Sequence, residues 1–206
     1  RRKYQEREVE PQALSLSISE QQPVFLVGFP RSGTTLMETM LRAHKDIDVL
    51  PELPAVERAR AVLKKAKVNI YQPESWNEAV CELARQAYWD VVAEQGLDSI
   101  GPVLIDKMPL NIVYIGIIKR IFPGAKFILA LRHPCDAVVS CYMQDFQPNE
   151  EMAHFLSVSE SVDYYRDVFS LWETYKQKLT IDYLTIKYED LVVDFESQIE
   201  RVVKFL

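Results

Sequence analysis

The residues best suited to chemistry lie together in the segment 28–35, which reads Gly-Phe-Pro-Arg-Ser-Gly-Thr-Thr. Four residues separate its two glycines, a spacing typical of loops whose backbone N–H groups bind phosphate at the start of a helix. Gly33 is expected to adopt an unusual φ or to allow a close approach of neighbouring atoms. The loop also carries a guanidinium and three hydroxyl groups, from Arg31, Ser32, Thr34 and Thr35. The segment therefore predicts an anion-binding loop.

The same loop differs from those that bind nucleoside triphosphates. Such loops carry lysine where this chain has Thr34, and here the positive charge comes from Arg31 instead. A second basic residue, Arg132, ends an expected strand at 126–131, where an aspartate would be needed to hold Mg²⁺. Basic residues at both places favour two anionic groups bound without a metal. The alternative is a tight strand–helix turn that binds nothing.

A hydroxyl group follows Arg132 at a useful spacing. Ser140 comes eight residues later, about two turns along a helix that Pro134 is expected to start. A guanidinium fork together with a hydroxyl suits a phosphate monoester. An arginine that caps a neighbouring carbonyl, beside a packed serine, is the alternative. His133, at the bend between strand and helix, is expected to belong to the scaffold rather than to act as a general base.

Four short apolar runs predict the strands that must position these residues, because such runs are typical of buried parallel strands. They lie at 24–27, 103–105, 126–131 and 184–188. Helical patterns lie at 34–43, from a capping-box pattern at 75–78 to Gly96, at 110–122, from Pro134 onward, at 159–179 and at 195–206. This alternation predicts an α/β fold of three layers, a parallel sheet with helices on both faces, similar to P-loop nucleotide hydrolases. Ligands of such folds bind beyond the carboxyl ends of the strands.

Composition excludes several classes of protein. The chain has 206 residues, 48% of them apolar, which excludes a wholly disordered protein. Its net charge of −6 argues against a basic protein that binds nucleic acid. No apolar run reaches the roughly 18 residues of a transmembrane segment, and the charged stretch 1–12 lacks the apolar core of a signal peptide. We expect one domain at 23–206 after a polar tail at 1–22.

The cysteines and histidines of the sequence predict neither disulfide bonds nor a metal site. Cys81, Cys135 and Cys141 form an odd-numbered set without a C-x-x-C pair, and the three histidines lack metal-binding spacing. The cysteines are therefore expected to be buried or half-buried free thiols. Reduced thiols and the lack of a leader favour a cytoplasmic location, although a removed anchor would leave the same sequence.

The segment 29–36, Phe-Pro-Arg-Ser-Gly-Thr-Thr-Leu, resembles the 5′-phosphosulfate loop of sulfotransferases that use 3′-phosphoadenosine 5′-phosphosulfate (PAPS). Its arginine-containing form is similar to that of tyrosylprotein sulfotransferases and of bacterial sulfotransferases joined to tetratricopeptide repeats. The resemblance covers most of 23–206. It implies a metal-independent enzyme with PAPS as donor and a hydroxyl-bearing acceptor, and it points to tetratricopeptide repeats upstream. Because relatives continue where this chain ends inside a helix, it also implies a domain without its C-terminal end.

The resemblance assigns the two ends of the donor to two groups of residues. Five loop residues would hold the 5′-phosphosulfate: Arg31, Ser32, Gly33, Thr34 and Thr35. Arg132 and Ser140 would hold the 3′-phosphate, and Gln144 stands where some relatives carry a second arginine. Tyr188, in the segment 188–191, matches a tyrosine near the nucleotide, although packing alone also explains a tyrosine at a strand end.

Two further residues match catalytic positions of the family. Glu52, within 49–54, matches the base of tyrosylprotein sulfotransferases, and its proline and leucine neighbours are expected to desolvate it partly. Lys107, within 105–109, matches a lysine whose ammonium stabilises the leaving adenosine 3′,5′-bisphosphate. The implied reaction is in-line sulfuryl transfer with Glu52 as base. A solvated loop carboxylate and a surface lysine paired with Asp106 are the alternatives.

Two other functions are compatible with the sequence. A P-loop small-molecule kinase shares the glycine spacing but needs Mg²⁺ ligands and a lysine at the phosphates. A non-catalytic nucleotide-binding module needs only the loop. The acceptor is open among a protein tyrosine, a saccharide and a small alcohol, since Pro54 replaces an arginine of the tyrosylprotein branch and Arg58 lies one turn further on.

Overall fold

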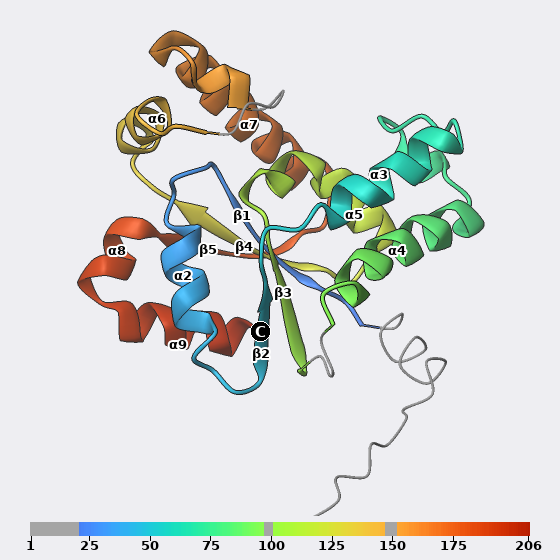
Figure 1. Ribbon diagram of the computed structural model, residues 1–206, viewed down its shortest axis with the longest axis horizontal. Helices are drawn as coiled ribbons and strands as arrows, with labels where there is room; N and C mark the ends of the chain where they lie inside the picture. Colours follow the sequence, from blue (N-terminus) through green and yellow to red (C-terminus); the bar gives the residue numbers. More distant parts are fainter. Residues whose placement is uncertain (1–20, 97–100, 147–151) are drawn as a thin grey trace, which may run out of the picture.

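The computed structural model describes residues 21–96, 101–146 and 152–206, so that most of the expected tail at 1–22 lies outside the described residues. Five parallel strands form one sheet in the order β2-β3-β1-β4-β5. Their bounds are Val24–Gly28 (β1), Ile47–Leu50 (β2), Val103–Lys107 (β3), Lys126–Leu131 (β4) and Asp182–Lys187 (β5). Because all strands run the same way, their carboxyl ends share one edge of the sheet (Figure 1).

The alternation of side chains along β1 divides the core between the two faces of the sheet. Phe25 and Val27 belong to the larger core, while Val24 and Leu26 belong to the smaller one. The helices over the larger core are α3 (Ala55–Lys65), α4 (Glu78–Ala93), α5 (Ile115–Ile121) and α7 (Val158–Lys178). Those over the smaller core are α2 (Thr34–Leu41), α8 (Tyr188–Val193) and α9 (Phe195–Phe205). The predicted α/β fold with helices on both faces is confirmed (Figure 1).

Shorter elements follow the strands at the carboxyl edge. The 3-10 helix η2 (Pro109–Tyr114) comes directly after β3, and α6 (Pro134–Tyr142) comes after β4 and packs against α7. Two further 3-10 helices, η1 (Pro73–Ser75) and η3 (Met152–Phe155), precede α4 and α7. Pro134 occupies the first turn of α6, as its restricted φ predicts.

The sequence interpretation missed β2 and α3. β2 has only four residues, and Asp48 interrupts its apolar run. α3 begins directly after Pro54 with no side-chain cap on its first turn, so the usual sequence signal of a helix start is missing. Its apolar face, formed by Ala55, Val56, Ala59 and Leu63, does follow helical spacing and could have indicated the helix.

The first turn of α4 differs from the expected capping box. Ser75 lies in η1, and the helix begins at Glu78. Its cap is Asn77, whose side chain accepts a hydrogen bond from the N–H of Val80 at 2.9 Å. The expected cap at Ser75 is wrong, because Asn77, two residues later, accepts the hydrogen bond from the first turn of α4.

Two other expected elements change in extent. The helix expected at 110–122 divides into η2 and α5, because Pro109 starts a 3-10 turn. The strand expected at 184–188 ends at Lys187, so Tyr188 opens α8 instead of closing a strand.

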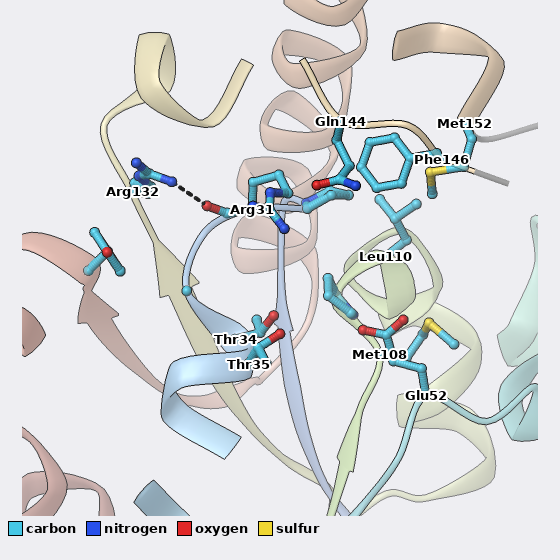
Figure 2. A pocket seen from close by; sticks show the side chains of 14 residues that line it. Arg31, Thr34, Thr35, Glu52, Met108, Leu110, Arg132, Gln144, Phe146 and Met152 are labelled. Atoms are coloured by element: carbon cyan, nitrogen blue, oxygen red, sulfur yellow. Dashed lines mark hydrogen bonds between the residues drawn. The ribbon is translucent and has the colours of Figure 1, made fainter. Parts of the chain in front are cut away.

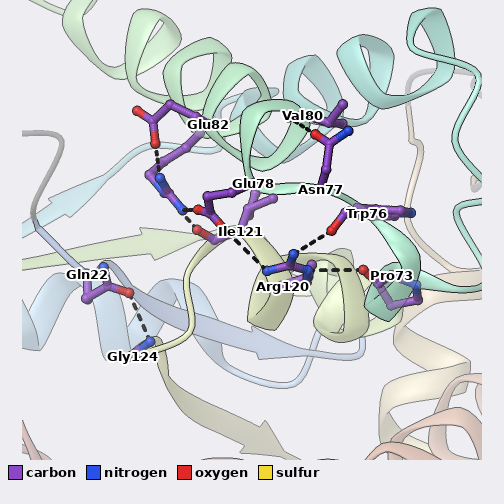
Figure 3. A network of polar contacts seen from close by, with 11 residues as sticks. Gln22, Pro73, Trp76, Asn77, Glu78, Val80, Glu82, Arg120, Ile121 and Gly124 are labelled. Carbon is purple, nitrogen blue, oxygen red and sulfur yellow. Dashed lines mark hydrogen bonds and ion pairs between the residues drawn. The ribbon is translucent and has the colours of Figure 1, made fainter.

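A polar network joins α4 and α5 to the chain between α3 and α4 (Figure 3). Arg120 of α5 donates hydrogen bonds to the carbonyl oxygens of Pro73 (3.1 Å) and Trp76 (2.6 Å). Arg85 of α4 donates to the carbonyl of Ile121 at 2.9 Å. Guanidinium groups thus satisfy carbonyls at element ends, which fixes this helical layer over the larger core.

The three cysteines, all within the described ranges, are free thiols. Cys81 and Cys141 are buried as expected. Cys135 is exposed, which contradicts the expectation, because the inward side of α6 is occupied by Ala137 and Cys141 instead. Among the described helices, none has the length and apolar character that crossing a membrane requires.

Candidate active site

The loop between β1 and α2 has an unusual backbone. Gly33, just before α2, has a φ of 91°, in the left-handed region that glycine adopts without strain, as expected from its place in the motif. A Cβ atom at this position would lie 2.5 Å from Cδ2 of Tyr188. Arg31 also has a positive φ, 67°, which is costly for a residue with a side chain. Strain of this kind is typical of ligand-binding loops.

A cavity of about 590 Å³ lies at the carboxyl edge of the sheet, in front of this loop (Figure 2). Every strand contributes to its wall, because each is followed within a few residues by a lining residue: Arg31 after β1, Glu52 after β2, Met108 after β3, Arg132 after β4 and Tyr188 after β5. Gly33, Thr34 and Thr35 also line it. Seven of the ten residues predicted for the site therefore surround one space.

The two expected anion sites adjoin each other. Arg31 Nε donates a hydrogen bond to Ser140 Oγ at 3.0 Å. Arg132 Nη1 donates to the carbonyl of Arg31 at 3.0 Å (Figure 2). A second cavity, of about 460 Å³, is lined by Ser140 and shares Arg31, Arg132 and Gln144 with the first. Arg31 is therefore placed between the two cavities, within reach of both.

Two buried polar atoms of this region have no hydrogen-bond partner among the described residues: Ser32 Oγ and Arg132 Nε. An unpaired buried donor is costly unless a ligand or water satisfies it. Arg132 lines both cavities, so its guanidinium group can meet an anion there, although the Nε atom itself is buried. Ser32 is 2% exposed, and its backbone N–H closes the loop by donating to Phe29 O at 3.2 Å. Its side chain thus lies further from the cavity than those of its neighbours.

Tyr188 is held beside the loop by the first turn of α8. The Glu189 carboxylate accepts a hydrogen bond from the N–H of His133 at 2.8 Å, and this bond lowers the pKa of Glu189. The guanidinium of Arg132 lies 4.7 Å from the centre of the Tyr188 ring. The ring therefore forms a flat wall between the loop and the end of β4, where an aromatic ligand could stack.

The two residues predicted to act in catalysis contact each other. Lys107 Nζ lies 2.7 Å from Glu52 Oε1 and 3.1 Å from Glu38 Oε2. The Glu52 side chain is 51% exposed, so the expected desolvation by its proline and leucine neighbours is wrong: they leave the carboxylate open to the cavity. Lys107 is 5% exposed and does not line the cavity itself; it contacts Glu52, which does. It is neither a surface lysine nor paired with Asp106.

Asp106 points to the opposite face of the sheet, because successive side chains of a strand alternate. Its carboxyl accepts hydrogen bonds from Tyr88 OH at 2.9 Å and from Asn111 Nδ2 at 3.4 Å. Burial raises the pKa of Asp106 to about 7, since a charged carboxylate is poorly solvated there. The aspartate at the end of β3 is thus used inside the core.

The sequence interpretation missed Glu38 and the apolar wall of the cavity. Glu38 lies one helical turn beyond Thr34 on α2, a spacing that could have placed it on the loop side of the helix. Side chains of Met108, Leu110, Phe146 and Met152 line the cavity opposite the arginines (Figure 2). No local pattern marks these four, because they come from the ends of separate elements.

Comparison with known proteins gives consistent results. Protein-tyrosine sulfotransferase 2 of Gallus gallus is 28% identical over 198 residues, which are 89% of this chain and 50% of that protein. An uncharacterised protein of Aquifex aeolicus is 40% identical over 132 residues, 60% of this chain and 17% of that protein. The chain thus spans half or less of the length of these curated relatives.

A solved structure shares the fold. The sulfotransferase STF9 from Mycobacterium avium superposes with a TM-score of 0.62 at 16% identity, covering 95% of this chain and 66% of that one. A sequence profile described as the sulfotransferase family matches residues 23–206, from just before β1 to the end of α9. The match includes the loop, all five strands and every residue of the cavity described above, and the chain therefore belongs to the sulfotransferase family.

Proposed function

We propose that this chain transfers a sulfuryl group from PAPS to the hydroxyl group of an acceptor. The observation that carries the proposal is the convergence of Arg31, Arg132 and Glu52 on one cavity at the carboxyl edge of the sheet. Two guanidinium groups suit an anionic donor, and a carboxylate open to the same space suits a base. The relatives named as sulfotransferases support the same reaction class.

The donor would be held by its two charged ends. The start of α2, with Thr34 and Thr35, faces the cavity and would bind the 5′-phosphosulfate together with Arg31 and Gly33. The guanidinium of Arg132 would bind the 3′-phosphate, and Ser140, which lines the adjoining cavity with it, would share in this binding. Tyr188 would stack on the adenine or ribose side of the donor. Ser32 would contribute through the shape of the loop.

The chemistry needs one proton transfer and one exchange of S–O bonds. The bound donor supplies the sulfuryl group. The acceptor oxygen forms a bond to sulfur while the bond from sulfur to the bridging oxygen breaks, and adenosine 3′,5′-bisphosphate leaves with the electron pair. Glu52 takes the acceptor proton. The ammonium of Lys107, 2.7 Å from Glu52 Oε1, stabilises the negative charge that develops on the leaving oxygen. In-line placement of the two oxygens requires the acceptor to enter on the Glu52 side.

A third cavity, of about 610 Å³, supports this direction of entry. It shares Glu52, Met108, Leu110 and Met152 with the donor cavity. Arg60 and Lys64, one turn apart on α3, line it as well. We propose that the acceptor occupies this space, with its hydroxyl at Glu52. A protein tyrosine, a saccharide and a small alcohol are all compatible with a cavity of mixed charge.

Transfer from labelled PAPS to a panel of phenols, sugars and short tyrosine peptides tests the proposal. The wild-type chain should label at least one acceptor, and Arg31→Ala should reduce labelling strongly, because it loses a charged donor contact. The exposed Arg201→Ala on α9, away from both cavities, serves as the matched arginine control. A wild-type chain that binds adenosine 3′,5′-bisphosphate but labels no acceptor would support the non-catalytic module instead.

Calorimetry separates the proposal from the kinase alternative. A kinase needs a carboxylate for Mg²⁺ near the phosphates, and Asp106, the last but one residue of β3, is bound by Tyr88 on the other face of the sheet. Adenosine 3′,5′-bisphosphate should therefore bind more tightly than ATP with Mg²⁺. Tighter, Mg²⁺-dependent binding of ATP would contradict the proposed function.

A further inference from the structure

The ammonium group of Lys107 is held between two carboxylates from different elements. Glu52 follows β2 and Glu38 lies in the middle of α2, while Lys107 itself ends β3. The Nζ atom lies 2.7 Å from Glu52 Oε1 and 3.1 Å from Glu38 Oε2, and the Lys107 side chain is 7% exposed. Three segments of the chain therefore meet at one buried positive charge.

The two carboxylates around this charge are not equivalent. The Glu52 side chain is 51% exposed and lines the cavity, whereas that of Glu38 is 15% exposed. Glu38 is also fixed from its other side, because Arg42 lies 3.0 Å from its Oε1 atom, one helical turn along α2. Glu52 can thus turn toward a substrate, while Glu38 is anchored by cations on both sides.

We infer that Glu38 is a positioning residue, the counter-ion that stays with Lys107 when Glu52 accepts the acceptor proton. The inference rests on the proposed sulfuryl transfer, in which Glu52 is the base. Once Glu52 is protonated it carries no charge, and its ion pair with Lys107 is lost. The carboxylate of Glu38 still lies 3.1 Å from the ammonium and keeps it in its place.

The physical reason lies in the burial of Lys107. A nearly buried ammonium that loses its only counter-charge is strongly destabilised, so it would move toward water or give up its proton. Either event would remove positive charge at the moment when negative charge develops on the leaving oxygen. With Glu38 in place, the ammonium stays in position. Once Glu52 is protonated, it no longer compensates the positive charge of Lys107, which can then stabilise the leaving group more strongly.

The substitution Glu38→Gln tests this inference, because it keeps the size of the side chain and removes its charge. We expect kcat to fall by about 10-fold or more, as for other misplaced catalytic groups, while the KM for PAPS stays the same. Glu38→Asp keeps the charge at a shorter reach and should recover part of the loss. Glu200→Gln is the matched control, since Glu200 also pairs with a lysine at 2.7 Å, on the exposed side of α9.

A double-mutant cycle distinguishes positioning from a general structural role. If Glu38 acts through Lys107, Glu38→Gln should lower kcat in the wild-type chain and leave it unchanged in a Lys107→Ala chain. Calorimetric binding of adenosine 3′,5′-bisphosphate checks that every variant is folded, and Glu38→Asp replaces Glu38→Gln in the cycle if the latter does not bind it.

The possible results separate the inference from the proposed function. An equal loss of kcat in both backgrounds would overturn the role of Glu38 and leave sulfuryl transfer intact. Normal turnover by Lys107→Ala would remove Lys107 from the mechanism, and the role of Glu38 with it. A wild-type chain that transfers no sulfuryl group to any acceptor would overturn both.

Discussion

Two neighbouring residues at the end of β3 divide the molecule into two regions with different physical demands. Asp106 points into the larger core, where Tyr88 binds its carboxyl, and Lys107 points to the cavity side, where Glu38 and Glu52 bind its ammonium. The two residues are 1% and 5% exposed. Burial alone therefore does not distinguish the two residues. Their partners do, since Asp106 contacts a neutral tyrosine and Lys107 contacts two carboxylates.

The core region offers Asp106 neutral partners. Tyr88 packs edge-on against Phe122 and Trp89 with ring centroids 4.9 and 5.2 Å away. The Asp106 carboxyl is hydrogen-bonded there, and no described lysine or arginine forms an ion pair with it. Burial there favours the protonated carboxyl. The cavity region instead offers Lys107 two carboxylates, those of Glu38 and Glu52, as ion-pair partners. We propose that the aromatic side stabilises the fold and that the charged side performs the reaction.

The strongest test of this division is the pair Lys107→Ala and Asp106→Asn. Lys107→Ala should lower kcat for sulfuryl transfer by about 10²-fold or more, because it removes the positive charge that stabilises the leaving oxygen. Asp106→Asn should leave kcat of the folded enzyme near the wild-type value. Steady-state rates with labelled PAPS decide between them. A comparable loss in both variants would show that the two regions are not separate.

The pH dependence of stability tests the core region alone. The pKa of Asp106 is raised from its ordinary value of 3.8 to about 7 in the folded chain, so between these values the folded state binds more protons than the unfolded state. The contribution of Asp106 to the free energy of unfolding is therefore full below about pH 4 and is lost as the pH rises to about 7. The loss can reach about 1.4 kcal/mol per pH unit.

Asp106→Asn should remove this dependence, since asparagine does not titrate. Denaturant unfolding of both chains between pH 4 and 7 gives the measurement, and the wild-type free energy should decline relative to the variant across that window. Other titrating groups cancel in the difference. A difference that does not change with pH would mean that Asp106 titrates outside this range.

On the cavity side, Gly33→Ala should destabilise the loop by about 1–3 kcal/mol, through left-handed strain and the clash with Tyr188. Gly96→Ala is the matched control, because Gly96 has a φ of 65° but no described residue has an atom within 4 Å of its added Cβ. Both variants carry the strain, and only the first also displaces Tyr188. The binding constant for adenosine 3′,5′-bisphosphate should therefore fall for Gly33→Ala alone. Equal binding by the two variants would show that Tyr188 does not contact the donor.

The smallest effect is expected from Tyr88→Phe in the core. It removes one hydrogen bond to Asp106 while keeping the aromatic packing, which should cost about 1–2 kcal/mol of the free energy of unfolding. Thermal unfolding near pH 8 measures this loss, and kcat should stay unchanged. A fall in kcat that exceeds the fraction of protein unfolded would mean that Tyr88, on the core side of β3, also affects catalysis.

The anion loop could be predicted from the sequence because its residues are contiguous. Glycine spacing, the left-handed φ at Gly33 and the helix that starts at Thr34 all follow from local rules. The positions of Arg132 and Ser140 followed in the same way from a strand end and a helix period. The fold class followed from the alternation of apolar runs with helical patterns.

The surroundings of Lys107 could not be predicted, because its partners come from distant parts of the chain. Glu52 and Lys107 are 55 residues apart, and they meet because β2, which has no strong sequence signal, pairs with β3 in parallel. The exposure of Glu52 likewise depends on how the segment before α3 leaves the sheet. Local composition suggested an apolar environment, and the tertiary packing gave an open one.

By itself, the sequence determined the layered α/β architecture and the glycine loop that leads into α2, because these depend on periodicity and on short-range spacing. Only the tertiary structure decided which charges meet. It joined the two anion sites through Arg31, turned Asp106 into the core and placed Glu38 beside Lys107. The reason is that ion pairs act over a few ångströms, and the strand order that sets those distances is a property of the whole sheet.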